Sequence, residues 1–168
     1  MPRKILEFNR DHGILFFRIT SDIVPFASHP VIDLPWQDRF RAQIGEIGRL
    51  IRDSGMRISM HPDQFILINA PDETIVERSI AELRYHAEVL DLMDLDTTAK
   101  IQIHVGGVFG DREASIRRFI DRARAGWAGP SCGGWPSRTM TSDFPSLTAS
   151  SSMMGPASLS SSMSSTIS

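Results

Sequence analysis

The segment MRISMHPDQF, residues 56–65, decides the fold of this chain. Polar and apolar residues alternate from position 57 to position 61, which is the two-residue period of a β-strand. The strand is expected to end at His61, because the proline that follows has no amide hydrogen for the next bond of the ladder. We therefore predict a short buried strand that ends in a histidine, followed by a bend that carries Gln64 and Phe65.

Two more apolar runs of strand length flank this one, ILFFRI at 14–19 and KIQIHVG at 100–106. Between the runs, apolar residues recur at helical spacing over 40–51 and 75–90, and again from 116 onward. Gly55 is placed to cap the first of these helices. The segment KILEFNRDHG, at 4–13, looks like the end of an earlier helix. This alternation predicts an α/β fold with a parallel sheet.

Two architectures fit the alternation, a doubly wound sheet and a (β/α)8 TIM barrel. A whole barrel needs roughly 250 residues, whereas this chain has 168 residues and three visible β/α units. If the fold is a barrel, we expect a partial one.

Three histidines follow or end the three predicted strands: His29, His61 and His104. In parallel α/β folds the carboxyl ends of the strands and the loops after them form the active face. Imidazole is a common ligand of zinc, manganese and iron. The alternative is that each histidine is a hydrogen-bonded structural residue, which is our interpretation of His12 and His86.

Composition bounds the class of protein. The formal net charge is -2, without a long basic run, so charge alone neither indicates nor excludes nucleic-acid binding. The single cysteine, Cys132, excludes an intrachain disulfide and fits a reducing cytosol. No apolar run is long enough to span a bilayer, and residues 1–13 are too charged for a signal peptide. We predict a cytoplasmic protein without a membrane segment.

Four ordered segments carry a family resemblance. They are GILFFRITSDIVPFASHP at 13–30, RISMHPDQF at 57–65, AELRYHAEVLDLM at 81–93 and IQIHVGGVFGDREASIRRF at 101–119. Together they resemble the UV damage endonuclease family over residues 6–120. The resemblance implies a TIM barrel with a divalent metal cluster, usually manganese, at its carboxyl face. It also implies a DNA repair enzyme, a monomer, that nicks damaged double-stranded DNA on the 5′ side of UV photoproducts.

The resemblance also assigns residues. His29, His61 and His104 would be metal ligands, and His61 and His104 would belong to the catalytic centre. Gln64 and Phe65 would probe the damaged bases, one through its polar edge and the other by stacking. We add Arg18 and Asn9 as support for the site. A buried guanidinium at position 18 would need either a substrate phosphate or a carboxylate as its partner.

The chain also departs from the family pattern. The first strand of the family is missing before Leu6, and the acidic ligands and histidines of its second half do not appear. We therefore place the partial barrel at 1–125 and expect the fragment alone to be weak or inactive. Two alternatives stay open, a sugar isomerase-like metal enzyme with the same barrel and a noncatalytic fragment.

The tail, residues 126–168, has a different composition. It holds 14 serines but only one basic and one acidic residue, Arg138 and Asp143, so we predict that it is disordered. Tryptophan and methionine each have a single codon. If the coding sequence of the tail is read in a frame that begins one base earlier, these codons permit amino-acid sequences similar to the missing family segments. Our hypothesis is that the reading frame shifted between Arg122 and Trp127. Sequencing the gene tests it, and stop codons in the shifted frame would contradict it.

Overall fold

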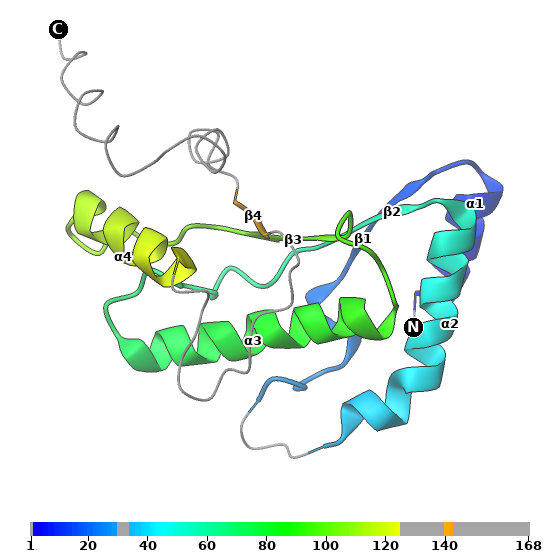
Figure 1. Cartoon of the computed structure of the whole chain (residues 1–168), viewed down its shortest axis with the longest axis horizontal. Coiled ribbons are helices and arrows are strands. Elements are labelled where there is room, and N and C mark those ends of the chain that lie inside the picture. The colour runs from blue at the N-terminus through cyan, green and yellow to red at the C-terminus, as the bar shows by residue number, and fades with distance from the viewer. Residues whose placement is uncertain (1, 30–33, 125–139, 143–168) are drawn as a thin grey trace, which may run out of the picture.

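The structure is a computed structural model, and it describes residues 2–29, 34–124 and 140–142. Helices and strands alternate along the chain (Figure 1). In order they are α1 (Arg3–Asp11), β1 (Phe16–Ile19), a 3-10 turn (Ser21–Ile23), α2 (Trp36–Ser54), β2 (Arg57–Met60), α3 (Glu73–Leu92), β3 (Lys100–Ile103), α4 (Arg112–Arg124) and β4 (Met140–Ser142). The predicted strands and helices are all present, each within a few residues of its predicted bounds.

The strands form one parallel sheet in the order β1-β2-β3-β4. Arg18 of β1 is level with Ser59 of β2, and Ser59 is level with Lys100 of β3. Three residues of the tail, Met140–Ser142, pair with β3 as the fourth strand, and the disorder predicted for 126–168 stays a prediction. The rest of that tail lies outside the described residues. The mixed α/β class with a parallel sheet is confirmed.

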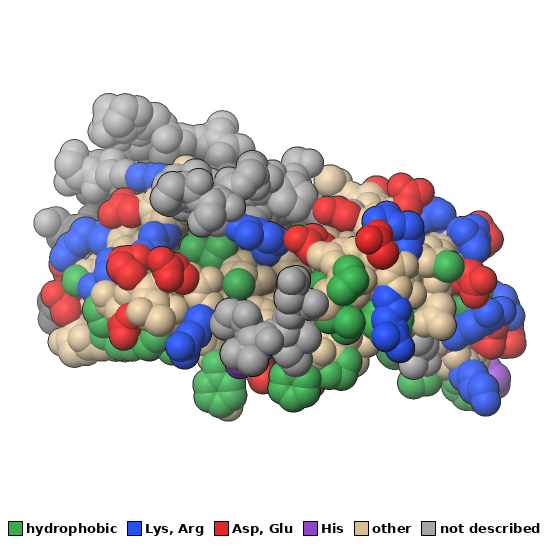
Figure 2. All heavy atoms as spheres, turned by 90° about the horizontal axis from the view of Figure 1, so that it is seen from below, with side chains coloured by type: hydrophobic (Ala, Val, Ile, Leu, Met, Phe, Trp, Pro, Cys, Tyr) green, Lys and Arg blue, Asp and Glu red, His purple; other side chains and the backbone are tan. Residues whose placement is uncertain are grey.

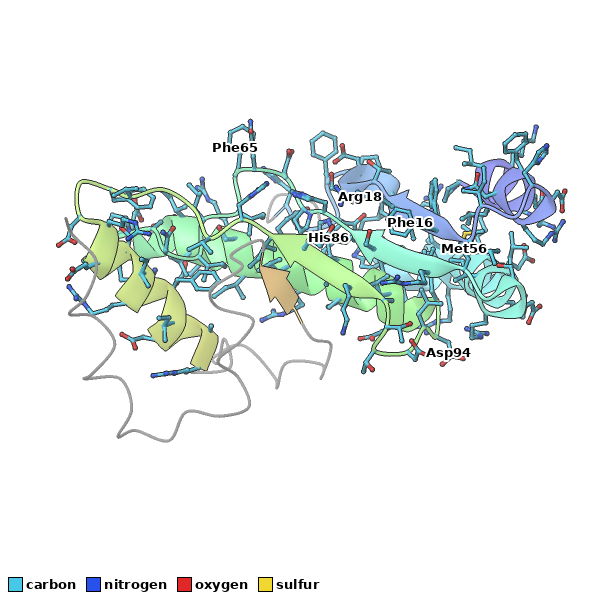
Figure 3. All side chains as sticks on the ribbon, turned by 90° about the horizontal axis from the view of Figure 1, so that it is seen from above. Phe16, Arg18, Met56, Phe65, His86 and Asp94 are labelled. Atoms are coloured by element: carbon cyan, nitrogen blue, oxygen red, sulfur yellow. The ribbon has the colours of Figure 1, made fainter. Side chains whose placement is uncertain are left out.

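One face of the sheet is buried by the helices. Side chains alternate between the two faces of a strand, and the core contains the apolar set Ile19, Ile58, Met60, Ile101 and Ile103. The helices add Ile44, Ile47 and Ile51 from α2 and Leu83, Ala87 and Leu90 from α3 to the same cluster. Seen from above, the strands lie in front of α3 (Figure 3). The other face, which carries Arg18 and Gln102, is left for polar contacts.

Local signals explain where the helices begin and end. Gly55 takes the left-handed conformation after α2, with φ 65° and ψ 23°, as the sequence predicted. Asp72 precedes α3, and its side chain accepts a hydrogen bond from the amide of Thr74. Asp111 caps α4 in the same manner by accepting from the Ala114 amide. The aspartates at positions 72 and 111 therefore cap helices by accepting hydrogen bonds from backbone amides.

The surface seen from below mixes Lys and Arg with Asp and Glu, and hydrophobic side chains project along one margin (Figure 2). No helix in the described part of the chain is long and apolar enough to cross a membrane.

Two glycines of α2 give a matched test of this packing. A Cβ on Gly48 would lie 1.9 Å from the backbone oxygen of Met93, whereas a Cβ on Gly45 would meet nothing within 4 Å. We expect Gly48→Ala to destabilise the chain by more than about 2 kcal/mol, because backbone must move. Gly45→Ala is expected to stabilise it by about 0.5–1 kcal/mol through helix propensity. Urea unfolding of the two variants measures both values, and equal effects would show that α2 does not pack on the end of α3 as described.

Candidate functional site

Two imidazoles meet at the carboxyl edge of the sheet. His61 follows β2 directly, and His104 follows β3 directly. Their ring centroids are 4.9 Å apart and the ring planes are tilted by 57°. His61 is half-buried and His104 is exposed, so the pair opens to solvent. We call these two residues the imidazole pair.

The ring of His61 is held in one tautomer. Its Nδ1 lies 2.7 Å from the carbonyl oxygen of Pro62, and a carbonyl can only accept, so Nδ1 carries the hydrogen. In the neutral ring the lone pair is then on Nε2. Metal-binding histidines commonly donate their second N–H to a carbonyl in this way, which fixes the ring orientation. The geometry of His61 therefore fits a metal ligand that uses Nε2.

His29 lies on the loop after β1 and is exposed. Its amide donates to the carbonyl of Phe26 at 3.0 Å, and its ring stands edge-on to the Phe26 ring at 6.4 Å. Within residues 2–29, 34–124 and 140–142, no three His, Cys, Asp or Glu side chains gather closely enough to hold one ion. The structure thus brings His61 and His104 together, and the metal set His29, His61 and His104 stays a prediction.

The loop that carries His29 is held to α3 by one buried and one partly buried hydrogen bond, which the sequence did not reveal. The Val24 amide donates to the Tyr85 hydroxyl at 2.8 Å, and the Ser28 hydroxyl donates to the Glu82 carboxylate. Burial raises the pKa of Tyr85, so the hydroxyl stays neutral near pH 7. The tyrosine and glutamate lie in the AELRYHAEVLDLM segment, but only packing shows which loop they hold.

His86, the neighbour of Tyr85, is fully buried. Its Nδ1 lies 2.8 Å from the carbonyl oxygen of Glu82, to which it donates. Nε2 is buried and has no hydrogen-bond partner in the described part of the chain. Burial lowers the pKa of His86, although the charges of Glu82 and Asp22 act in the opposite direction. The structural interpretation of this histidine therefore holds, since it is a neutral core residue.

Gln64 and Phe65 are both exposed on the loop after β2, and 72% of Phe65 is accessible. Phe65 stands out from this loop in the view from above (Figure 3). Residues 68–70, which follow on the same loop, are held by hydrogen bonds from two arginines of α4. Arg118 donates to the carbonyl of Asn69 at 2.8 Å, and Arg122 donates to the carbonyls of Ile68 and Ala70, each at 2.7 Å. The bend thus presents the pair predicted to probe DNA from an anchored loop.

Arg18 and Asn9 were predicted to support the site. Arg18 is exposed and donates to the side-chain oxygen of Gln102 at 2.6 Å. Its partner in the described structure is therefore an amide of β3, neither a carboxylate nor a phosphate. Asn9 is buried in α1, and its carbonyl accepts from the Ile14 amide at 2.8 Å. Its role in a site stays a prediction.

Gly106 in the loop after β3 has φ +104°, a conformation that suits glycine. A Cβ there would lie 2.2 Å from the side-chain oxygen of Asn69, which itself is buried. The side-chain Nδ2 of Asn69 donates to the carbonyl of Gly107 at 2.8 Å. The glycine thus makes room for a side chain that joins two of the loops at the carboxyl edge.

Comparison with known proteins identifies the family. The family model described as UV-endonuclease UvdE matches residues 2–125. A UV DNA damage endonuclease of Clostridium perfringens is 41% identical over 118 residues, and one of Bacillus pumilus is 36% identical over 121 residues. The fold is that of a DNA repair endonuclease family, and the chain belongs to the UV-endonuclease UvdE family.

A solved structure gives the same result. The chain matches the crystal structure of SacUVDE with a TM-score of 0.69 and 46% sequence identity, over 73% of this chain and 42% of that one. The two matches above cover 70% and 72% of this chain but only 29% and 38% of the relatives. The chain therefore spans less than half the length of the proteins that it matches.

The buried His86 predicts how the stability of the chain depends on pH. Its pKa is lowered by folding, so the unfolded state takes up a proton first. The stability is fully present above the unfolded pKa of about 6.5 and falls as the pH drops below it. Asp22, Glu82 and His61 are the charged or titratable groups that act on this ring.

We expect urea unfolding to show a loss of stability between pH 7.5 and pH 5.5 that is smaller in His86→Asn. The asparagine amide can replace Nδ1–H as donor to the Glu82 carbonyl but does not titrate. Equal pH dependence in the wild type and the variant would contradict a neutral, buried His86.

Proposed function

We propose that this chain is part of a metal-dependent DNA repair endonuclease that nicks damaged DNA on the 5′ side of UV photoproducts. The observation that carries the proposal is the imidazole pair, two rings 4.9 Å apart at the carboxyl edge of a parallel sheet. Membership of the UvdE family supports a DNA substrate. We propose further that the whole protein acts as a monomer in the cytoplasm, on double-stranded DNA.

The described sheet would be one part of a (β/α)8 barrel. Four parallel strands follow one another in chain order without a reversal, as the strands of such a barrel do. A doubly wound sheet would instead change direction at a switch point. In a barrel, the face that carries Arg18 and Gln102 would look into the interior, and the imidazole pair would lie at the catalytic mouth.

A divalent metal, manganese by family resemblance, would be held by His29, His61 and His104, with His61 and His104 nearest the reacting phosphodiester. Bound metal ions of this kind activate water and stabilise negative charge on phosphodiester oxygens. The Pro62 carbonyl keeps the hydrogen of His61 on Nδ1, so Nε2 stays free to bind. Gln64 and Phe65, exposed beside this pair, would contact the damaged bases by hydrogen bonding and stacking.

The described residues do not gather three ligands for one ion, so we expect weak Mn²⁺ binding and little or no nicking by the 168-residue chain. The test variant is His61→Asn, because asparagine keeps the donor to the Pro62 carbonyl and removes Nε2. We expect it to weaken Mn²⁺ binding at least about ten-fold in calorimetry. His12→Asn is the matched control, because Nδ1 of His12 also meets a backbone carbonyl, that of Phe8.

A second experiment compares the binding and nicking of UV-irradiated DNA with those of untreated DNA. We expect the chain to prefer the irradiated DNA, and a chain whose reading frame is restored after Arg122 to nick it 5′ of the photoproducts when Mn²⁺ is present. If the chain binds irradiated and untreated DNA equally and does not bind Mn²⁺, the chain is a noncatalytic fragment, which is the alternative left open by the sequence. Robust nicking by the 168-residue chain would show instead that the described residues suffice for catalysis.

A further inference from the structure

Three exposed phenylalanines lie on the three loops that follow β1, β2 and β3. The exposed fractions are 68% for Phe26, 72% for Phe65 and 42% for Phe109. Phe26 and Phe65 are the two most exposed large apolar side chains in the described part of the chain. Because the strands are parallel, all three loops leave the sheet at the edge that carries the imidazole pair. We call these three residues the aromatic row.

Two members of the aromatic row have a strained backbone. Phe26 has φ 61° and Phe109 has φ 48°, in the left-handed region that bulky residues rarely adopt. The third non-glycine residue with positive φ in the described part is Asp94, a residue type that tolerates this region. Strain of this kind persists where the surrounding structure imposes it, and it concentrates at ligand-binding positions.

Hydrogen bonds to α3, one buried and one partly buried, hold the chain on both sides of Phe26. Val24 and Ser28 are tied to Tyr85 and Glu82 of α3. Tyr85 is only 4% exposed, so this attachment is part of the core. The loop therefore has a fixed path on either side of a side chain that it leaves in solvent.

The loop of Phe109 is fixed in the same way. The hydroxyl of Ser115, a buried residue of α4, donates to the carbonyl of Val108 at 2.6 Å. The side chain of Asn69 donates to the carbonyl of Gly107 at 2.8 Å. Both residues that precede Phe109 are thus anchored, while its ring stays exposed.

We propose that Phe26 and Phe109 contact DNA bases together with Phe65, so that the aromatic row holds the bases around a lesion at the edge of the sheet that carries the imidazole pair. The inference rests on the proposed function, because DNA is the partner at this edge. Each ring comes from its own anchored loop, which suits stacking on bases or insertion between base steps. A protein-binding surface would instead join apolar side chains into one contiguous patch.

The test uses the 168-residue chain and a duplex with one thymine cyclobutane dimer and 2-aminopurine beside it. We expect Phe26→Ala and Phe109→Ala each to weaken binding about five- to a hundred-fold, the range of base–aromatic stacking. They should also reduce the change in 2-aminopurine fluorescence on binding. Phe8→Ala is the matched control, because Phe8 is 54% exposed but lies on α1.

Leucine variants separate stacking from packing. Phe26→Leu and Phe109→Leu keep an apolar side chain and the strained backbone but remove the ring, so we expect them to bind as weakly as the alanine variants. Thermal unfolding of each variant shows whether the chain is still folded. If an alanine variant does not fold, the leucine variant at the same position is used for the binding measurement instead.

The outcomes distinguish this inference from the proposed function. If the wild type prefers the damaged duplex while the Phe26 and Phe109 variants bind as Phe8→Ala does, the inference is wrong and the proposed function stands. Leucine variants that bind like the wild type would also overturn base stacking. If the wild type binds damaged and intact duplexes equally, the proposed function fails, and the inference fails with it.

Discussion

The parallel pairing of β1, β2 and β3 is the constraint on which the rest of the structure depends. Parallel neighbours end at the same edge of a sheet, so residues that follow successive strands meet there. His61 and His104 are far apart in the sequence, yet their rings are 4.9 Å apart because each follows one of two parallel neighbouring strands, β2 and β3. The loops after the strands share this edge for the same reason.

Side chains alternate between the two faces of each strand, so one face packs in the core and the other carries polar groups. On one face, Ile58 and Met60 of β2 join the core beneath α2 and α3. On the other face, the Arg18–Gln102 hydrogen bond joins β1 to β3 across β2, which contributes the buried Ser59 to that face. The core thus fixes the strands while the opposite face and the carboxyl edge keep polar groups available. This division fits a barrel interior, which is the architecture proposed for the whole protein.

Helices α3 and α4 act as supports for the loops at this edge. Tyr85 on α3 holds the loop of His29, and Arg118 and Arg122 on α4 hold the residues that follow Phe65. These hydrogen bonds, which are buried or partly buried, satisfy backbone polar groups and stabilise each loop without covering its tip. Exposed rings and strained backbone at the tips are therefore compatible with a stable fold.

The sequence by itself determined the order of strands and helices, the Gly55 cap and the position of His61 at the end of β2, because periodicity and caps are local properties of the chain. Only the tertiary structure decided that Arg18 pairs with Gln102, that His86 is neutral, and that Met140–Ser142 adds a fourth strand. Each of these depends on burial or on contacts between distant segments. Such contacts leave no periodic signal in the sequence, since they are set by how the strands and helices pack.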